Sequence, residues 1–357
     1  MGGCGAFVRP PIRFGQLSFA HYHAAFWAQA IVDHPDARLV GVWDDDPARG
    51  EEAAARHDTQ YFGNLEALLR ECDAVGITSE TVRHADLVEQ AARAGVHILC
   101  EKPMATTVQD CDRIQRAVDA SGVVFMQNYP KRFDPINHEL VGRVHRGDLG
   151  RVVLVRIRHG HSQGRQPEFL RQWFVDPDQS GGGTLLDEGV HAADFLLWLL
   201  GPPEQVTAVV SNRALHLRTE DTAAAFFTYS SGALAEVVTS WNFVAAEHSV
   251  EIYGSEGTAL LSGVDLASKD FSSVPHLKIF RLGGSRGVWE SSPTATSFGS
   301  GTFHHGGPRH FIECLGTGRR PALGVEEGRR PVEMILAAYR AAASGRSQPV
   351  VFARPTA

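Results

Sequence analysis

The sequence predicts an α/β protein of two domains, with an N-terminal doubly wound parallel sheet and a C-terminal α+β domain built on a large, mostly antiparallel sheet. Two observations predict this fold class. Residues 1–128 alternate short apolar runs with helix-like segments, whereas residues 129–357 contain successive strand-like runs joined by short turns. A length of 357 residues allows each domain a substantial core.

The N-terminal domain is predicted from apolar runs of strand length. These runs are Ile12–Leu17, Leu39–Trp43, Ala74–Thr78, His97–Cys100 and Val123–Gln127. The helix-like segments between them are Ala24–Val32, His84–Ala94 and Val108–Ala120, and Asp46 is the expected cap of a further helix from Pro47. Strands that alternate with helices at this spacing pair in parallel, and the helices then cover both faces of the sheet.

The C-terminal domain is predicted from strands that follow one another directly. Its predicted strands are Arg151–His161, Gln205–Asn212, Thr222–Ser230, Ala233–Trp241, Ser249–Tyr253 and Thr258–Leu261. Ser230–Ser231–Gly232 is typical of a hairpin turn. Two helices are expected, Asp187–Leu200 and Pro331–Ala343, the second opened by its proline. The Ser- and Gly-rich segment 265–301 is predicted to be a long irregular loop.

Charge and composition exclude several classes of partner. A net charge of −7 and a pI near 6.2 argue against a nucleic-acid-binding face, which needs clustered cations. No apolar run of 18 residues predicts a membrane span. The N-terminal Met1–Ala6 is expected to be a disordered leader rather than a signal peptide. The five cysteines form no CxxC pair, so reduced thiols in a cytoplasmic protein are expected.

Asp187 and His191 are the most informative pair in the chain. They follow the glycine run 181–183 and lie four residues apart, so on one helix they would share a face and meet the same substrate hydroxyl. The apolar run 195–200 would bury that helix. Polar groups at the start of a buried helix are costly unless they are satisfied or used, so a pocket is predicted here.

The turn after the first strand is the candidate phosphate-binding turn. Ser18, Ala20 and His23 occupy the three positions where a dinucleotide-binding turn usually has glycine. Ser and Ala are small enough to let a pyrophosphate approach, and the following helix offers free N–H groups. Considered alone, the segment also fits a plain strand-to-helix turn.

Two further strand ends carry charged residues. Asp44 ends the second strand, where a carboxylate accepts hydrogen bonds from the adenosine ribose and repels a 2′-phosphate, which favours NAD over NADP. Asp44 to Asp46 would otherwise serve only to cap a helix. Lys102, in Glu101–Lys102–Pro103, follows another strand at the edge where doubly wound sheets bind ligands.

In this order, the motifs resemble the glucose–fructose oxidoreductase, inositol dehydrogenase and MocA (Gfo/Idh/MocA) family. The motifs that carry the resemblance are Asp44, His84, Glu101–Lys102–Pro103, Arg132–Phe133–Asp134–Pro135, and Gly181–Gly183 with Asp187 and His191. The resemblance covers nearly the whole chain and implies a Rossmann domain (1–128), a substrate and oligomerisation domain (129–357), a bound NAD and a cis peptide before Pro103. Two turns depart from the family pattern, the glycine-poor phosphate turn and Thr78–Thr81.

The resemblance also implies the residues of the site. The implied catalytic residues are Lys102, Asp187 and His191. The expected cofactor contacts are Ser18, Phe19, Ala20, His21, Asp44, Ser79, His84, Glu101, Lys102 and Asn128. The expected substrate contacts are Lys102, Arg132, Arg158, His159, His161, Trp173, Asp187 and His191, with the 265–301 loop and His304 as further specificity elements.

The implied activity is NAD-dependent oxidation of a secondary hydroxyl on a sugar, glycoside or cyclitol. His191 would remove the hydroxyl proton, Lys102 would polarise the oxygen, and Asp187 would orient the substrate or tune His191. Two alternatives stay open: an enzyme that oxidises the sugar transiently and restores its NAD, and a non-catalytic NAD-dependent sensor. A homodimer or homotetramer is expected, because a large sheet with an open face usually meets a partner.

Two other aromatic groupings allow alternative interpretations. His159 and His161 would face the same way on a strand and could line a sugar pocket, bind a metal or lie on the surface. No carboxylate or cysteine lies beside them at ligand spacing, so no metal is predicted. Trp173 is a candidate for stacking on a sugar face, or a core residue.

Overall fold

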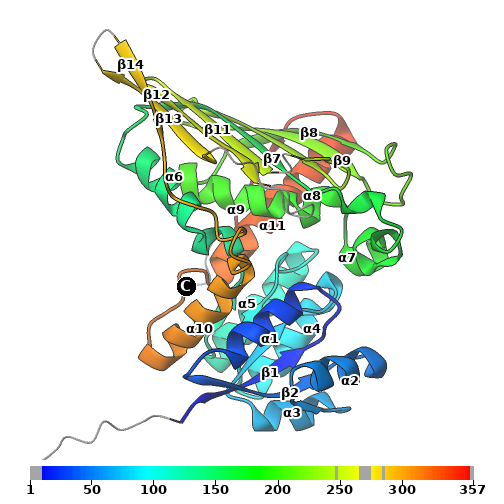
Figure 1. Ribbon diagram of the computed structural model, residues 1–357. Helices are drawn as coiled ribbons and strands as arrows, with labels where there is room; N and C mark the ends of the chain where they lie inside the picture. Colours follow the sequence, from blue (N-terminus) through cyan, green and yellow to red (C-terminus); the bar gives the residue numbers. More distant parts are fainter. Residues whose placement is uncertain (1–9, 246–247, 265–274, 284–285, 354–357) are drawn as a thin grey trace, which may run out of the picture.

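The computed structural model describes residues 10–245, 248–264, 275–283 and 286–353, so the predicted leader Met1–Ala6 lies outside the described residues. Figure 1 shows two stacked parts, with the N-terminal sheet and its helices below a broad second sheet. Within the described ranges, no helix has both the length and the apolar character that crossing a membrane requires.

The N-terminal sheet confirms the doubly wound prediction. Its strands are β1 (Ile12–Leu17), β2 (Ala37–Trp43), β3 (Gln60–Tyr61), β4 (Ala74–Ile77), β5 (His97–Cys100) and β6 (Phe125–Gln127). All pairs are parallel, in the order β3-β2-β1-β4-β5-β6. The order reverses between β1 and β4, and ligands of such sheets bind at the carboxyl ends beside that point.

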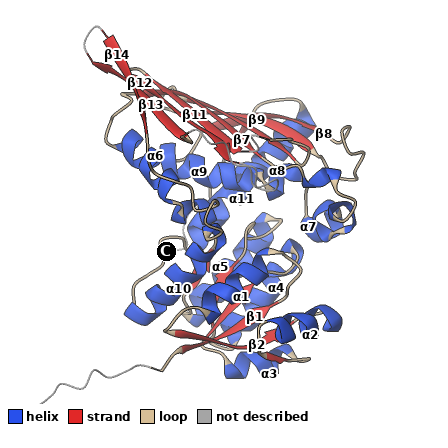
Figure 2. Ribbon diagram, viewed as in Figure 1, coloured by secondary structure: helices blue, strands red, loops and turns tan. Residues whose placement is uncertain are grey.

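Helices lie on both faces of this sheet, as alternating strands and helices require (Figure 2). They are α1 (His23–Val32), α2 (Pro47–Arg56), α3 (Leu65–Glu71), η1 (Thr81–Arg83), α4 (His84–Arg93) and α5 (Val108–Ser121). Asp46 caps α2 as predicted, because its carboxylate accepts hydrogen bonds from the N–H groups of Ala48 and Arg49. Phe14, Trp27 and Ile77 are fully buried in the core between the sheet and its helices.

The C-terminal sheet is mostly antiparallel, also as predicted. Its strands are β7 (Val152–His159), β8 (Gln205–Ser211), β9 (Thr222–Thr228), β10 (Leu234–Ser240), β11 (His248–Gly254), β12 (Gly257–Val264), β13 (Leu277–Gly283), β14 (Arg286–Ser291) and β15 (Gln348–Pro349). Their order is β14-β13-β12-β11-β7-β10-β9-β8-β15, and β7 with β10 is the parallel pair among these described strands.

One face of this sheet is covered by helices, and the helices separate it from the N-terminal domain (Figure 1). The longer elements are α6 (Pro135–His145), α9 (Gly189–Leu200), α10 (Gly306–Thr317) and α11 (Val325–Ser344). The short ones are η2 (Pro130–Phe133), η3 (Gln163–Arg165), η4 (Phe169–Arg171), η5 (Trp173–Val175), α7 (Pro177–Ser180), α8 (Thr184–Asp187) and η6 (Phe303–His305). Helix α9 packs on β7 and β10, and α11 packs on α9 and β8.

Two predictions about the C-terminal part are wrong. Segment 265–301 is not one irregular loop, because β13 and β14 pair within it; residues 265–274 and 284–285 lie outside the described residues. In β13 polar residues alternate with the apolar ones, and the segment as a whole is rich in Ser and Gly, so its sequence pattern indicated a loop. Pro331 does not open its helix but lies inside α11, which begins at Val325, where the carboxylate of Glu327 accepts the backbone N–H of Gly324 at 2.8 Å.

Candidate active site

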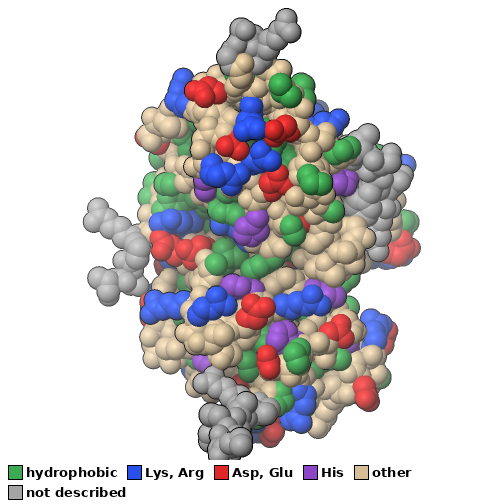
Figure 3. Space-filling model, turned by 60° about the vertical axis from the view of Figure 1, so that its left-hand side comes forward, with side chains coloured by type: hydrophobic (Ala, Val, Ile, Leu, Met, Phe, Trp, Pro, Cys, Tyr) green, Lys and Arg blue, Asp and Glu red, His purple; other side chains and the backbone are tan. Residues whose placement is uncertain are grey.

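A cavity of about 760 Å³ lies where the two domains meet. Its wall combines the loop after β5, the start of α1, the end of β7, the turn between α8 and α9, and the segment before η6. The lining residues are Tyr22, His23, Phe26, Lys102, Pro130, Lys131, His159, His161, Gln163, Glu188, His191, Phe298, Gly299, Ser300, Gly301, Phe303 and His304. In the view of Figure 3, histidine side chains reach the surface at several places across the middle of the molecule.

The helix predicted at Asp187–Leu200 is interrupted. Asp187 ends α8, Glu188 lies between the helices, and His191 is in the first turn of α9. The glycine run lets α8 start against its neighbours, because a Cβ on Gly183 would overlap the backbone oxygen of Glu220. The Glu220 carboxylate in turn accepts the N–H of Leu185 at 2.9 Å. The shared-face argument for Asp187 and His191 therefore fails, since it requires one continuous helix.

Asp187 is bound from two sides instead. Nζ of Lys102 lies 2.7 Å from its Oδ1 and 3.1 Å from its backbone oxygen. The indole N–H of Trp241 donates to its Oδ2 at 3.0 Å. Burial works to lower the pKa of Lys102, but the carboxylates of Asp187, Glu188 and Glu101 outweigh it and hold that pKa above its ordinary value. Lys102 is therefore an ammonium at neutral pH.

His191 has the opposite electrostatic setting. Burial, followed by the positive charges of Lys102 and Lys131, holds the pKa of His191 well below its ordinary value, so its imidazole is neutral at pH 7. Its ring centroid lies 4.9 Å from that of His159. A neutral imidazole can accept a proton, and it lines the same cavity as the ammonium of Lys102.

Glu188 lies against two histidines, His159 at the end of β7 and His161 two residues further along the chain. Its Oε2 lies 3.2 Å from Nε2 of His159, and its Oε1 lies 3.4 Å from Nε2 of His161. Nδ1 of His161 accepts the N–H of Gln163 at 3.2 Å, so a ring proton is on Nε2 and is donated to Glu188. No carboxylate stands beside these histidines at ligand spacing in the sequence, and folding brings Glu188 to them from 27 residues after His161.

Three groups of side chains have potential metal-ligand atoms within 4.8 Å of one another. The first is His159, Glu188 and His191, the second is His161, Asp187 and Glu188, and the third is His21, His23 and Glu101. These are the groups of at least three such residues found in the described parts of the chain. In the first group, Glu188 is already engaged by two imidazoles, and the ammoniums of Lys102 and Lys131 act on His191. The absence of a metal remains a prediction.

The phosphate turn supplies the backbone shape of a dinucleotide site. Ser18 has φ +69°, the left-handed conformation that the first glycine of such a turn usually provides. Its hydroxyl accepts the N–H of Ala20 at 3.1 Å, and the N–H of His21 donates to the backbone oxygen of Thr78. Serine thus keeps the glycine geometry and binds one of the turn's own donors. The small residues Ser18 and Ala20 leave room for a dinucleotide, while His21 accepts the first N–H groups of α1, those of His23 and Ala24.

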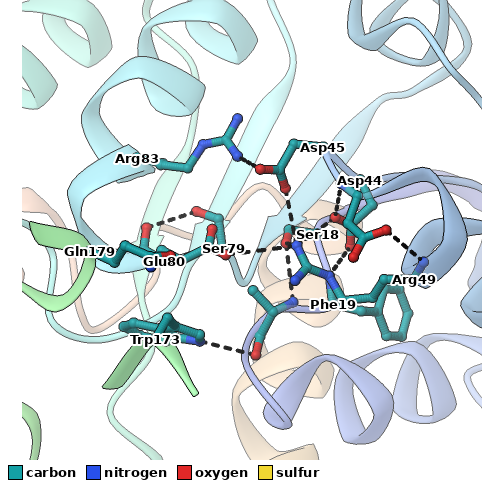
Figure 4. Close-up of polar contacts among 12 residues, drawn as sticks. Ser18, Phe19, Asp44, Asp45, Arg49, Ser79, Glu80, Arg83, Trp173 and Gln179 are labelled. Atoms are coloured by element: carbon teal, nitrogen blue, oxygen red, sulfur yellow. Dashed lines mark hydrogen bonds and ion pairs between the residues drawn. The ribbon is translucent and has the colours of Figure 1, made fainter. Parts of the chain in front are cut away.

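Asp44 lies beside this turn, at the end of β2 (Figure 4). Its Oδ2 accepts the N–H of Phe19 at 2.7 Å and Nε of Arg49 at 2.9 Å, and its Oδ1 accepts Nη2 of Arg49 at 2.6 Å. Burial raises the pKa of Asp44, but these hydrogen bonds, that of Arg49 foremost, outweigh burial and hold it below its ordinary value. A cation therefore accompanies the carboxylate expected at the ribose, and sequence reasoning missed it.

The other predicted cofactor residues lie at the ends of β4, β5 and β6 and support the loop of Lys102. Nδ1 of His84 lies 2.9 Å from the backbone oxygen of Pro103, and its Nε2 lies 3.3 Å from that of Ser79. Oε1 of Glu101 accepts the N–H of Lys102 at 3.0 Å, and its Oε2 accepts Nδ2 of Asn128 at 3.4 Å. The Lys102–Pro103 peptide is cis, as expected.

Four predicted substrate contacts do not line the cavity, and one of them is Asp187, which is bound by Lys102 and Trp241 instead. The indole N–H of Trp173 donates to the backbone oxygen of Ala20 at 3.1 Å, so Trp173 covers the phosphate turn. Arg132 forms an ion pair with Asp194 at 2.8 Å. Arg158 is exposed on the far face of β7, because neighbouring strand residues alternate and His159 faces inward.

Comparison with known proteins places both halves of the chain. A sequence profile described as oxidoreductase family, NAD-binding Rossmann fold, of the Gfo/Idh/MocA family matches residues 18–129. A second, described as the Gfo/Idh/MocA C-terminal domain, matches residues 138–260. The chain belongs to the Gfo/Idh/MocA oxidoreductase family. Its N-terminal domain is accordingly an NAD-binding Rossmann domain.

Relatives within the Gfo/Idh/MocA family share about a quarter of the sequence. Inositol 2-dehydrogenase of Rhizobium meliloti (strain 1021) is 27% identical over 282 residues, which cover 75% of this chain and 82% of the relative. The structure of aldose-aldose oxidoreductase from Caulobacter crescentus, complexed with glycerol, is 26% identical with a TM-score of 0.78 and covers 95% and 99% of the two chains. Levoglucosan dehydrogenase in complex with NADH and levoglucosan, 18% identical, shares the fold with a TM-score of 0.83 over 95% and 99% of the two chains.

Proposed function

We propose that this protein oxidises a secondary hydroxyl of a sugar, glycoside or cyclitol with NAD as the hydride acceptor. One observation carries the proposal. The ammonium of Lys102 and the neutral imidazole of His191 line one cavity at the carboxyl end of β5 in an NAD-binding domain. Proton removal and charge stabilisation are the tasks that the protein must perform in alcohol oxidation.

Ser18, Ala20, Asp44, Glu101 and Asn128 would hold the dinucleotide across the carboxyl ends of the strands. When bound, the nicotinamide supplies the hydride acceptor. The protein's own contribution is to bind the substrate, move its proton and exclude water.

His191 is the proposed general base, because its lowered pKa keeps the imidazole unprotonated and able to accept a proton at neutral pH. Lys102 has three N–H donors, of which two bind Asp187. The third can be donated to the reacting oxygen and stabilise its developing negative charge. Asp187 and Trp241 act through Lys102 by fixing the position of its ammonium.

The remaining wall suits a polyol ring. His159, His161 and Glu188 offer polar groups to further hydroxyls, while the aromatic rings of Tyr22 and Phe298 offer apolar faces to the C–H surfaces of a sugar. A mixed wall of this kind supports a carbohydrate substrate.

The test is a panel of sugars, glycosides and cyclitols assayed for NADH formation at 340 nm. His191→Asn and Lys102→Met are each expected to lower kcat by about 10²- to 10⁴-fold on any substrate found. His216→Asn, at an exposed histidine outside the cavity, serves as the matched control and should retain wild-type turnover. Wild-type turnover in both site variants would refute the assigned roles.

A second candidate is an enzyme that oxidises its sugar transiently and restores its own NAD. The position of Trp173 favours it, because this residue of the C-terminal part donates to Ala20 and its neighbour Phe174 packs on His21 with ring centroids 5.1 Å apart. Such a cover over the phosphate turn would slow cofactor exchange. NAD that stays bound through gel filtration, with sugar converted and no net absorbance change at 340 nm, would identify this activity.

A further inference from the structure

Lys131 is a buried amine in the cavity wall that the proposed chemistry does not use. It comes from η2, just after β6, and is 3% exposed. Its Nζ lies 5.8 Å from the ring centroid of Phe195, so an aromatic ring packs near the amine. A desolvated amine is costly unless a partner satisfies it.

No carboxylate in the described residues forms an ion pair with Lys131. The carboxylates around it already bind other side chains. Asp194 binds Arg132 through both oxygens, and Glu188 binds His159 and His161. Lys102, by contrast, has its counter-ion in Asp187.

Asp134 is committed as well, because it accepts hydrogen bonds from the N–H and hydroxyl of Ser297 and from the hydroxyl of Thr296. The cavity wall therefore holds one cation without an ion-pair partner among these acids. Burial lowers the pKa of Lys131 to about 7, although Glu188, Asp134 and Asp194 oppose this shift.

His248 holds the amine in place. Nδ1 of His248 lies 3.1 Å from the backbone oxygen of Arg158, which fixes the ring proton on Nδ1. Nζ of Lys131 lies 3.2 Å from both ring nitrogens of His248, and Nε2, which then carries no proton, is the one that can accept an amine proton. The remaining protons of Lys131 are available to a ligand in the cavity.

We propose that Lys131 binds a carboxylate of the substrate, so that the substrate class is an acid sugar, a uronate or an aldonate. This inference rests on the proposed function of the cavity. One unpaired cation matches one carboxylate, whereas a phosphate group carries about −1.5 to −2 charges at pH 7 and would leave charge unpaired. Lys102 and Lys131 line the same cavity of about 760 Å³, so the carboxylate and the reacting hydroxyl would belong to one small molecule held in it.

The test compares matched acid and neutral substrates, such as D-glucuronate with D-glucose and D-gluconate with D-glucitol. Wild-type protein should prefer the acid partner in kcat/KM. Lys131→Met should lower the ratio of kcat/KM for the acid over that for the neutral partner by about 10- to 100-fold, mainly through KM for the acid. Lys131→Arg, which keeps the charge, should restore much of the preference. A wild type without acid preference, or an equal loss on both partners in Lys131→Met, would overturn the proposal.

Calorimetric titration with the same sugars separates this inference from the proposed function. Acid-selective binding that Lys131→Met abolishes, without any turnover, would uphold the carboxylate site and contradict the dehydrogenase. Equal binding and equal turnover of neutral and acid sugars would uphold the dehydrogenase and contradict the carboxylate site. Thermal melting of Lys131→Met controls for folding: removal of an unpaired buried amine should leave the melting temperature unchanged or higher.

Discussion

Nζ of Lys102 lies 2.7 Å from Oδ1 of Asp187, and this ion pair joins the loop after β5 of the N-terminal domain to the end of α8 in the C-terminal domain. The pair keeps Lys102 protonated in spite of its burial, because the Asp187 carboxylate is the largest of the charges that raise its pKa. The ammonium that we propose to polarise the substrate oxygen therefore depends on Asp187, a residue that need not touch the substrate.

Asp187→Asn should consequently change the pH dependence of the reaction. The folded-state pKa of Lys102 is raised above its ordinary value, so wild-type activity should persist to high pH; without Asp187 burial dominates, the pKa falls, and activity should be lost at lower pH. At neutral pH kcat/KM should fall by about 10²-fold or more. The measurement is kcat/KM from pH 6 to 10.

Trp241→Phe is the matched control for this variant, because it removes the second hydrogen bond of Asp187 and keeps its charge. It should cause a smaller loss and leave the alkaline limb where it is in the wild type. Coincident pH profiles for the wild type and Asp187→Asn would contradict the role of the ion pair.

Cofactor preference should depend on Asp44 and Arg49 together. Asp44 holds Arg49 through both of its oxygens, so Asp44→Ala removes a negative charge and frees a guanidinium beside the expected ribose site. The ratio of kcat/KM for NADP over that for NAD should rise by about 10- to 100-fold, because arginine binds phosphate well. The double variant with Arg49→Ala should lose most of this gain. An unchanged ratio in Asp44→Ala would show that neither residue sets the cofactor preference.

Ser18→Gly tests the serine in the phosphate turn. A residue other than glycine at φ +69° costs about 1–2 kcal/mol, and the Ser18 hydroxyl occupies the N–H of Ala20. Glycine relieves the strain and frees that donor, so NAD should bind about 3- to 10-fold more tightly by titration calorimetry. Ser18→Ala frees the same donor and keeps the strain, so it should differ in thermal stability. Weaker NAD binding in both variants would show that the hydroxyl itself contacts the cofactor.

The sequence predicted the sheet of the N-terminal domain closely. The bounds of Ile12–Leu17 and His97–Cys100 agree with β1 and β5, because strands buried on both faces form continuous apolar runs between polar turns. Lys102 and His191 were also placed in one cavity by motif order alone. Such motifs are local, and their positions follow from the carboxyl edge of a parallel sheet.

The partners of these residues could not be predicted, since they depend on packing between distant segments. Glu188 meets His159 and His161 only when the turn after α8 lies on the end of β7, and Trp241 reaches Asp187 from the end of β10. Arg158 was assigned inward although strand alternation sends it to the opposite face from its neighbour His159.

Chelation tests the prediction that no metal is needed. His159, Glu188 and His191 are close enough to hold an ion, but Glu188 is engaged by two imidazoles and two lysine charges act on His191. Activity should therefore survive dialysis against EDTA, and added zinc should not stimulate it. Loss of activity on dialysis that zinc or another divalent ion restores would refute this and assign the three residues as ligands.

The uncovered face of the C-terminal sheet should form the contact between copies of this chain. Val209, Phe226 and Leu234, on β8, β9 and β10, are between 49% and 69% exposed, and exposed apolar side chains that gather on one face of a sheet mark interaction sites. Phe226→Asp should shift the protein from dimer or tetramer toward monomer in light scattering after gel filtration, while Phe226→Leu should keep the wild-type mass. The cavity is lined by residues on the helix-covered side of the sheet, among them His159 and His191, so monomeric Phe226→Asp should retain turnover. An unchanged mass in Phe226→Asp would place the subunit contact on another face.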